Sequence, residues 1–410
     1  MKNKILYNYF FVLFSIIPIS IVIGSAVSLV NILLIDLSFI IFLLYTKEFY
    51  FLKNKTIKII LLLYLYLIFN SLISQNFSIG AVRNFGFIRF FILFSAFNYF
   101  FYKNKYFNKI LIIWTLSLFV ICLDTYIESY FGKNILGYGG AEYANRIVSF
   151  FKDEPIVGGY INAFYLIIIG YLYFVFKDYS KKYKILFLII SILLLISILL
   201  TGERANAIKA FIGFFIFYFL NKNFVFKEKI ISLILMITLI SGMILSSDFL
   251  KVRYFHQDTV QINIDENKYF RLYRSGLSVF KNYPLFGVGN KNYRLETCNP
   301  NKEINNDYSN YECQTHPHQT YFEFLSEHGA VGSIILLIIL FKLIFSKLKI
   351  ILKSENYLQL GCFIYLLVIF IPIIPSGAFF GDQVQTLFWL NLSILYASNL
   401  ETNIFNKTKF

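Results

Sequence analysis

The sequence predicts an all-α integral membrane protein of about twelve transmembrane helices with one large loop on the outer side. Three observations lead to this class. The 410 residues are 58% hydrophobic and 15% charged, whereas a soluble domain carries roughly a quarter charged residues. Apolar stretches recur along nearly the whole chain and are long enough to cross a hydrocarbon core of about 30 Å. Aromatic residues reach 20%, and many lie near the ends of these stretches, where interfacial belts place them.

The expected spans follow one another from the N-terminus. They cover residues 9–24, 27–45, 57–73, 85–102, 109–127, 160–176, 185–200, 205–221, 230–246, 330–350, 357–374 and 380–398. Two connections are long, at about 128–159 and about 247–329, and the second is far too long to be a simple turn. We therefore divide the chain into 1–246 with nine spans, a large loop at 247–329, and 330–410 with the last three spans.

The net charge of +15 reflects membrane topology and not nucleic-acid binding. Lysines gather in both termini and in alternate connections, at residues 2–4, 47–58, 103–109, 177–184, 222–229, 342–353 and 407–409. Positive residues favour the cytoplasmic side, so both termini are expected in the cytoplasm.

The arginines follow a different pattern. All eight lie on the opposite side or inside a helix near its outer end: Arg83, Arg89, Arg146, Arg204, Arg253, Arg271, Arg274 and Arg294. The planar guanidinium suits bidentate recognition of phosphate and carboxylate. We interpret the pattern as an anionic ligand bound at the outer surface; the alternative is chance segregation in a lysine-rich chain.

The large loop contains two cysteines, Cys298 and Cys313. In an oxidising outer compartment they suggest a disulfide that closes a small loop, which would contribute at most about 3 kcal/mol. Two free thiols are the alternative. Neither cysteine is expected to be catalytic.

Two outer segments place arginines at helix positions. In the tight turn 201–206, Arg204 stands at or near a helix N-terminus at the membrane boundary, where it snorkels, pairs with Glu203 or faces a polar cavity that binds an anion. In the segment 271–289, a short amphipathic helix is expected to end before Pro284 and to carry Arg271 and Arg274 on one side. A solvated helix face is the plainer reading of that helix.

A third outer segment, 315–319, contains His316 and His318 around Pro317. Pro317 suits the first helical position, so His318 is expected in the first turn, where the helix dipole keeps the imidazole neutral and able to act as a general base. Glu323 and Glu327 would share one face of the continuing helix and orient neighbours or bind sugar hydroxyls. A structural histidine is the alternative. A metal site is disfavoured because two histidines make an incomplete set of ligands.

At these residues the chain resembles the O-antigen ligase/O-antigen polymerase superfamily of bacterial membrane glycosyltransferases. The most specific motif is a His, then Asn, Ser or Gln, nine residues, Gly, two residues and then Gly or a similar residue. It is complete here, from His318-Gln319 through Gly329 to Gly332.

Three arginines are also similar to family positions. Arg204 resembles the arginine at the outer start of a mid-chain helix. Arg271 resembles the arginine that opens the loop helix leading to Pro-x-x-Gly-x-Gly, here residues 284–289. Arg146 lies in a segment similar to the polymerase pattern Arg-x-x-Gly-x-Phe, with Ser149 in place of the glycine.

The resemblance implies a GT-C-like fold in the bacterial inner membrane, with a partly helical periplasmic loop, a glycan donor on undecaprenyl pyrophosphate and no cofactor or metal. It implies an inverting transfer to an acceptor hydroxyl of a lipid, such as lipid A-core, or of a glycan. The residues expected to bind the pyrophosphate are Arg204 and Arg271, helped by Arg274 and Arg146. His318 would deprotonate the acceptor. Further substrate contacts are expected from His316, Gln319 and Glu323.

Three functions remain open. The complete histidine–glycine motif favours a ligase, which moves finished glycan to an acceptor. The Arg146 segment and the tyrosine-rich loop favour a polymerase. A transporter of lipid-linked glycans should bury paired charges at the bilayer midplane, and Asp36 and Arg89 are the main charges expected inside the membrane.

Overall fold

The computed structural model describes residues 2–103, 106–140, 146–152, 154, 156–176, 181–256, 267–299 and 310–406. Within these ranges all regular secondary structure is helical and no strand occurs. The predicted all-α class is therefore confirmed.

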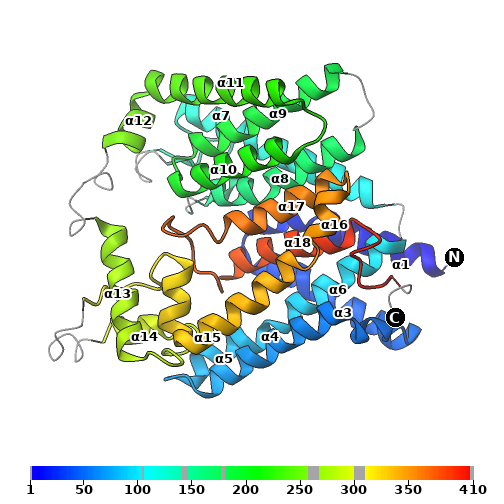
Figure 1. The fold of residues 1–410 in the computed structure, drawn as a ribbon, viewed down its shortest axis with the longest axis vertical. Helices are drawn as coiled ribbons and strands as arrows, with labels where there is room; N and C mark the ends of the chain where they lie inside the picture. Colours follow the sequence, from blue (N-terminus) through cyan, green and yellow to red (C-terminus); the bar gives the residue numbers. More distant parts are fainter. Residues whose placement is uncertain are drawn as a thin grey trace.

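The helices follow one another in the order that the apolar stretches predict (Figure 1). The first half contains α1 (Lys2–Ser15), α2 (Ile17–Ile23), α3 (Ser25–Thr46), α4 (Lys55–Leu72), α5 (Phe77–Gly86), α6 (Ile88–Lys103), α7 (Phe107–Phe131), α8 (Val157–Val175) and α9 (Lys181–Leu200). The second half contains α10 (Arg204–Leu220), α11 (Phe226–Ser246), α12 (Asp248–Lys251), α13 (Lys268–Asn282), α14 (Tyr293–Thr297), α15 (Thr320–Phe345), α16 (Leu348–Lys353), α17 (Tyr357–Val368) and α18 (Asp382–Ala397). Three further short helical segments occur in the described chain: η1 (Tyr50–Lys53), η3 (Ser149–Phe151) and η4 (Val252–His256).

Seven helices in the described ranges are long and apolar enough to cross a membrane. They are α3, α4, the continuous segment Phe77–Phe101 that covers α5 and α6, α7, α8, α9 and α11, and the bent pair α1–α2 makes an eighth if it forms one span. These helices support a multi-pass membrane protein. The expected number of twelve spans stays a prediction, although each expected range overlaps one helix or two consecutive helices.

The expected span 357–374 is wrong in its second half. α17 ends at Val368, and residues 369–381 form an irregular segment before α18 begins at Asp382. The segment carries Pro372 and Pro375; proline lacks the amide hydrogen that a helix needs and disfavours a helical conformation at the residue before it.

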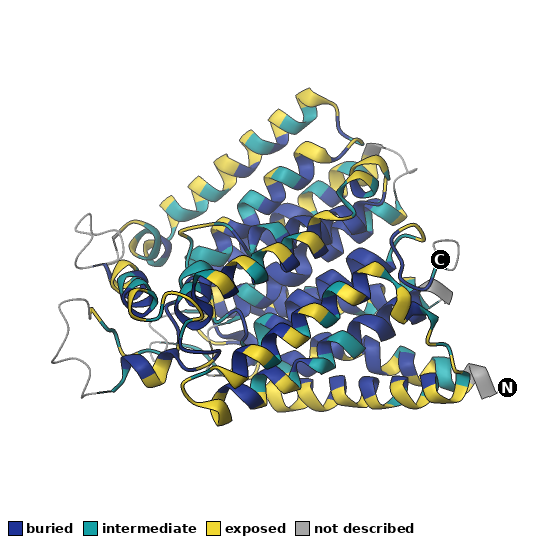
Figure 2. Cartoon of the chain, turned by 60° about the horizontal axis from the view of Figure 1, so that its bottom comes forward, coloured by how far each residue is buried: buried dark blue, intermediate teal, exposed yellow. Residues whose placement is uncertain are grey.

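The centre of the bundle is formed by α8, α17 and α18, whose residues are almost all buried (Figure 2). Two glycines let α8 and α17 approach closely. A Cβ added at Gly170 would lie 2.4 Å from the Tyr357 carbonyl oxygen, and one added at Gly361 would lie 2.1 Å from the Leu166 carbonyl oxygen. Small residues at such crossings are the usual basis of helix packing in membranes.

The described parts of the lysine-rich connections lie at one end of the bundle, together with the first and last described residues (Figure 1). The Lys222 ammonium donates to the Lys353 carbonyl oxygen over 3.4 Å, and that of Lys184 donates to the Asn223 carbonyl oxygen over 2.9 Å. This arrangement agrees with the expectation that these connections share one side of the membrane.

At the opposite end, α15 breaks at Gly329, where φ is 64°. The turn 284–289 fills the break. The amide of Ala330 donates to the Pro284 carbonyl oxygen over 2.7 Å, and that of Val288 donates to the Ser326 carbonyl oxygen over 3.0 Å. The Pro-x-x-Gly-x-Gly turn and the histidine–glycine motif therefore pack together as one unit. This unit joins the end of α13 to the first part of α15.

We expect Gly329→Ala to destabilise this unit. A Cβ at Gly329 would lie 2.3 Å from the Leu285 carbonyl carbon, in a left-handed backbone conformation. Together the strain and the overlap should cost about 3 kcal/mol or more, seen as a lower apparent Tm of the purified protein in detergent. Gly242→Ala in α11 is the matched control, because a Cβ there meets nothing within 4 Å. Equal Tm values for the two variants would contradict the packing described here.

Candidate functional site

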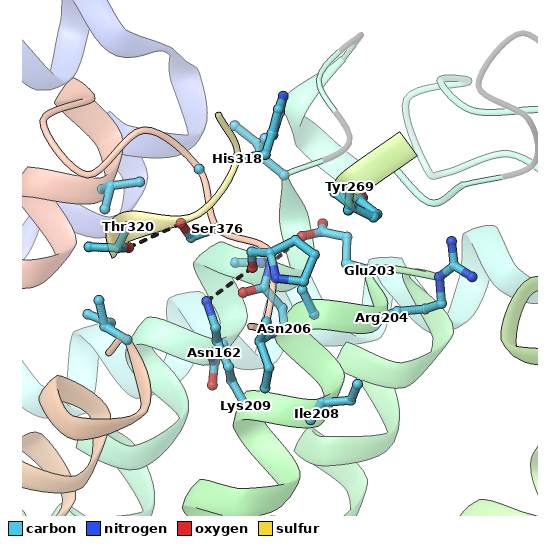
Figure 3. Close-up of a pocket in the computed structure, with 18 of the residues that line it drawn as sticks. Asn162, Glu203, Arg204, Asn206, Ile208, Lys209, Tyr269, His318, Thr320 and Ser376 are labelled. Carbon is cyan, nitrogen blue, oxygen red and sulfur yellow. Dashed lines mark hydrogen bonds between the residues drawn. The ribbon is translucent and has the colours of Figure 1, made fainter. Parts of the chain in front are cut away.

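A cavity of about 700 Å³ opens at the end of the bundle away from the termini. Its walls come from the segment before η3, from the N-terminal turns of α8 and α10, from η4, from α13 and from the irregular segment 369–381 (Figure 3). It brings together three residues predicted from the sequence, Arg146, Arg204 and His318.

Glu203 holds the beginnings of α8 and α10 together. Its carboxylate accepts hydrogen bonds from the amides of Gly158 (2.6 Å) and Gly159 (3.1 Å) and from the side-chain amide of Asn206 (2.6 Å). A carboxylate is favoured at a helix N-terminus because the first amides there lack helical acceptors. Glycine is required at position 158, where a Cβ would lie 2.9 Å from the Glu203 carboxyl carbon. Glu203 is therefore a structural residue of the cavity wall.

Arg204 follows directly as the first residue of α10 and lines the cavity. Within the described chain no hydrogen bond or ion pair engages its guanidinium, and Glu203 is directed to α8 instead. Of the alternatives that the sequence leaves open for Arg204, pairing with Glu203 is wrong. The guanidinium is thus available to a ligand.

Arg253 supplies a further guanidinium that the sequence analysis did not assign to the site. It lies in η4, and its Nε donates to the Gly202 carbonyl oxygen over 2.9 Å. Gly202 has a φ of +70°, a conformation that glycine adopts without strain. The contact places Arg253 beside Arg204, and both line the cavity. Burial and the neighbouring Arg204 lower the pKa of Arg253, as expected for a partly buried cation beside a like charge.

His318 lies outside the helix in which it was expected. α15 begins at Thr320, and Gln319 is its N-cap: the Gln319 side-chain oxygen accepts from the amides of Tyr321 (2.7 Å) and Phe322 (3.1 Å). His318 itself has a φ of 55°, and its carbonyl oxygen accepts from the Ser376 amide over 2.8 Å. The prediction that Pro317 opens the helix is therefore wrong by three residues, since the Gln319 side chain supplies the cap.

The imidazole of His318 is held in its neutral form. Burial, and then the charge of Lys268, lower its pKa from the ordinary value of 6.5. The sequence also predicted a neutral His318, but the main physical cause of the lowered pKa is burial and not the helix dipole. The ring centroid of His316 lies 4.0 Å from that of His318, and burial lowers the pKa of His316 to about 3. His318 is thus a neutral base at the edge of a cationic cavity.

The irregular segment 369–381 forms the apolar wall of the cavity. Side chains from α13 and α15 satisfy its backbone: Tyr273 donates to the Ile373 carbonyl oxygen (2.8 Å), Tyr321 donates to that of Phe370 (2.7 Å), and the Glu323 carboxylate accepts from the Phe379 amide (2.8 Å). The apolar residues that this wall and its neighbours present to the cavity include Ile208, Tyr365, Ile369, Ile373, Ile374, Val384 and Leu387.

Several predicted site residues do not line the cavity. Arg271 projects from the opposite side of α13 to Tyr269, and its Nε pairs with Glu312 over 3.0 Å. Arg274, His316, Gln319 and Glu323 are also absent from the lining. Gln319 caps α15 and Glu323 supports the apolar wall, so in this structure their side chains shape the site without facing it.

The expected cysteine pair is joined. Cys298 and Cys313 form a disulfide with a Cα–Cα distance of 4.5 Å. Like Gln319, this bond lies outside the cavity.

The cavity thus combines three chemical features. Guanidinium groups of Arg146, Arg204 and Arg253 can hold an anion with several oxygens, a neutral imidazole can accept a proton, and an apolar wall can receive a hydrocarbon chain. Lys209 and Tyr269 also line the cavity. The sequence contained a signal for Lys209, a lysine within an expected span, whereas nothing in the local sequence placed η4 against the turn 201–203.

Residues 189–337 match the family model described as O-antigen ligase. The match contains Arg204, Arg253, His318 and both glycines of the histidine–glycine motif, while Arg146 lies before it. It confirms the resemblance to the O-antigen ligase/polymerase superfamily. No curated protein matches the chain.

We expect Glu203→Ala and Arg204→Ala to differ in stability although the residues are adjacent. Glu203→Ala leaves the buried Gly158 amide and two half-buried donors, those of Gly159 and Asn206, without their acceptor, and should lower the free energy of unfolding by about 2–4 kcal/mol. Arg204→Ala removes no intramolecular bond and should change it by less than about 0.5 kcal/mol. Thermal unfolding in detergent measures both. A larger loss for Arg204→Ala would show that Arg204 has a structural role.

Proposed function

We propose that this chain, whose residues 189–337 match the O-antigen ligase family, is an inner-membrane glycosyltransferase that moves a glycan from undecaprenyl pyrophosphate to an acceptor hydroxyl. The observation that carries the proposal is the single cavity in which Arg146, Arg204 and Arg253 meet His318 and an apolar wall. A lipid-linked pyrophosphate has the matching parts: an anionic headgroup and a hydrocarbon chain.

In the proposed reaction, neutral His318 accepts the proton of the acceptor hydroxyl. The acceptor oxygen attacks the anomeric carbon, and the bond from that carbon to the pyrophosphate oxygen breaks on the opposite side, with inversion. The lipid pyrophosphate leaves with the electron pair, and the guanidinium groups stabilise the charge that develops on it. This role of the arginines makes a metal ion unnecessary for the departure of the leaving group.

A ligase is our first choice, with lipid A-core or a similar lipid as acceptor, because the histidine–glycine motif is complete. One observation favours the polymerase alternative: Arg146, which lies in the polymerase-like segment, lines the cavity. The transporter alternative receives less support. A transporter should pair charges at the bilayer midplane, whereas Arg89 pairs with Asp382, the first residue of α18.

We expect His318→Ala to lower kcat by about 10²–10⁴-fold, the usual contribution of a general base. The measurement is turnover of purified protein with a lipid-linked donor and a soluble acceptor. His318→Asn serves as a second variant of similar size, and an unchanged Tm shows that each variant is folded. Wild-type turnover in both variants would remove the general-base role.

The pH dependence of kcat/KM should show an acid limb below pH 6.5. The base must be neutral, and the neutral form prevails above the pKa of folded His318, which lies below its ordinary value. Activity is therefore retained as pH falls to 6.5 and is lost only at lower pH. In Lys268→Met the limb should move to higher pH, because a nearby positive charge is removed. A limb above 6.5 in the wild type would contradict this assignment.

The glycan profile of a deletion strain separates the two enzyme functions. For a ligase, long chains accumulate on the lipid carrier and the acceptor stays bare, and expression of the wild type but not of His318→Ala restores the attached chains. Single repeat units attached to the acceptor, with loss of long chains, would instead establish a polymerase.

A further inference from the structure

Lys209 is a buried cation in the wall of the cavity. Its exposed fraction is 6%, and it is the only lysine or arginine that is buried in the described part of the chain. It lies in α10 between apolar residues, far from the lysine-rich connections at the other end. Its position is therefore unrelated to the topological role of the other lysines.

No carboxylate among the described residues pairs with this charge. In the described chain Lys209 forms no ion pair, and its ammonium donates one hydrogen bond, to the Pro375 carbonyl oxygen over 3.3 Å (Figure 3). A buried ammonium without a counter-ion is unfavourable by several kcal/mol. Ionisable residues within membrane helices usually face a polar cavity and mark a binding site or pathway. An ammonium carries three donors, and Lys209 lines the cavity, so it can donate to a ligand bound there.

The depth of Lys209 distinguishes it from the arginines. α10 begins with Arg204 at the cavity and runs towards the lysine-rich end, so Lys209 lies about 7.5 Å deeper along the helix axis. Its neighbours in the lining include Ile208 and Ile369 of the apolar wall. In a lipid-linked pyrophosphate bound with its chain against that wall, the phosphate next to the lipid is the deeper one.

We propose that Lys209 binds the phosphate next to the lipid, whereas Arg204 and Arg253 bind the phosphate next to the sugar. The inference rests on the proposed function and deepens it. Charge develops during transfer on the phosphate that leaves the sugar, while the phosphate next to the lipid keeps its charge throughout. Lys209 therefore contributes equally to the ground state and the transition state, and the arginines contribute more to the transition state.

The first test is kinetic. Lys209→Met should raise KM for the donor about tenfold to a hundredfold, the range for one charge-assisted hydrogen bond, and leave kcat within about twofold. Arg204→Met should lower kcat. Lys251→Met on the exposed α12 is the matched control and should resemble the wild type. A fall in kcat for Lys209→Met with unchanged KM would overturn the assignment.

The second test measures binding of farnesyl monophosphate and farnesyl diphosphate to the full-length protein in detergent. Lys209→Met should weaken both ligands about tenfold or more, because both carry a phosphate next to the lipid. Arg204→Met should weaken the diphosphate alone. Lys209→Gln keeps a donor for Pro375 without the charge and should behave as Lys209→Met, whereas Lys209→Arg should retain most of the affinity.

The outcomes separate the two proposals. If Lys209→Met and Lys209→Gln bind both ligands as the wild type does while Arg204→Met loses the diphosphate, the assignment of Lys209 is wrong and the proposed function stands. If Lys209→Gln binds normally and only Lys209→Met is impaired, Lys209 merely holds Pro375 and the assignment is wrong. If the wild type binds neither ligand, the proposed function fails, and the assignment of Lys209 fails with it.

Discussion

The site depends on one constraint: irregular backbone inside a membrane bundle must have its polar groups satisfied by the protein or by a water-filled cavity. Residues 369–381 are such backbone. Tyr273 of α13, Tyr321 of α15 and Lys209 of α10 each donate to one of its carbonyl oxygens, and Glu323 accepts from its amides. Through these bonds one segment joins three helices and fixes the shape of the cavity. If α17 continued as a regular helix through residues 369–381, these hydrogen bonds could not form.

A second anchor acts on the opposite wall. The Glu203 carboxylate uses the free amides at the start of α8, so the turn before α10 is fixed. Arg204 is then the next residue, and Arg253 is fixed against the same turn through Gly202. The Glu203 carboxylate thus serves as a structural acceptor, and Arg204, Arg253 and Arg146 line the cavity beside it. Because the acidic side chain acts within the protein framework, several arginine side chains can lie close together in the cavity while the fold stays intact.

Much of the fold could be predicted from the sequence because membrane helices depend on local hydrophobicity. The order of the helices, the lysine-rich end and the sites of His318 and Arg204 follow from local patterns. The early end of α17 was also visible in principle, since Pro372 lies within the expected span 357–374 and Pro375 directly follows it. The role of Arg271 could not be found in this way, because the face that α13 turns to the cavity is set by the contact of Tyr273 with the distant residue Ile373. Arg253 escaped for a similar reason, as its position depends on a bond to Gly202 across about fifty residues of chain.

The measurement that tests the account most directly is a cryo-electron microscopy structure of the protein with undecaprenyl pyrophosphate in a lipid nanodisc. The account predicts diphosphate density within hydrogen-bonding distance of Arg204 and Arg253, on the side of the cavity where His318 lies, with the lipid chain along Ile369 and Ile373. Diphosphate density at Arg271 and Arg274, outside the cavity, would contradict it.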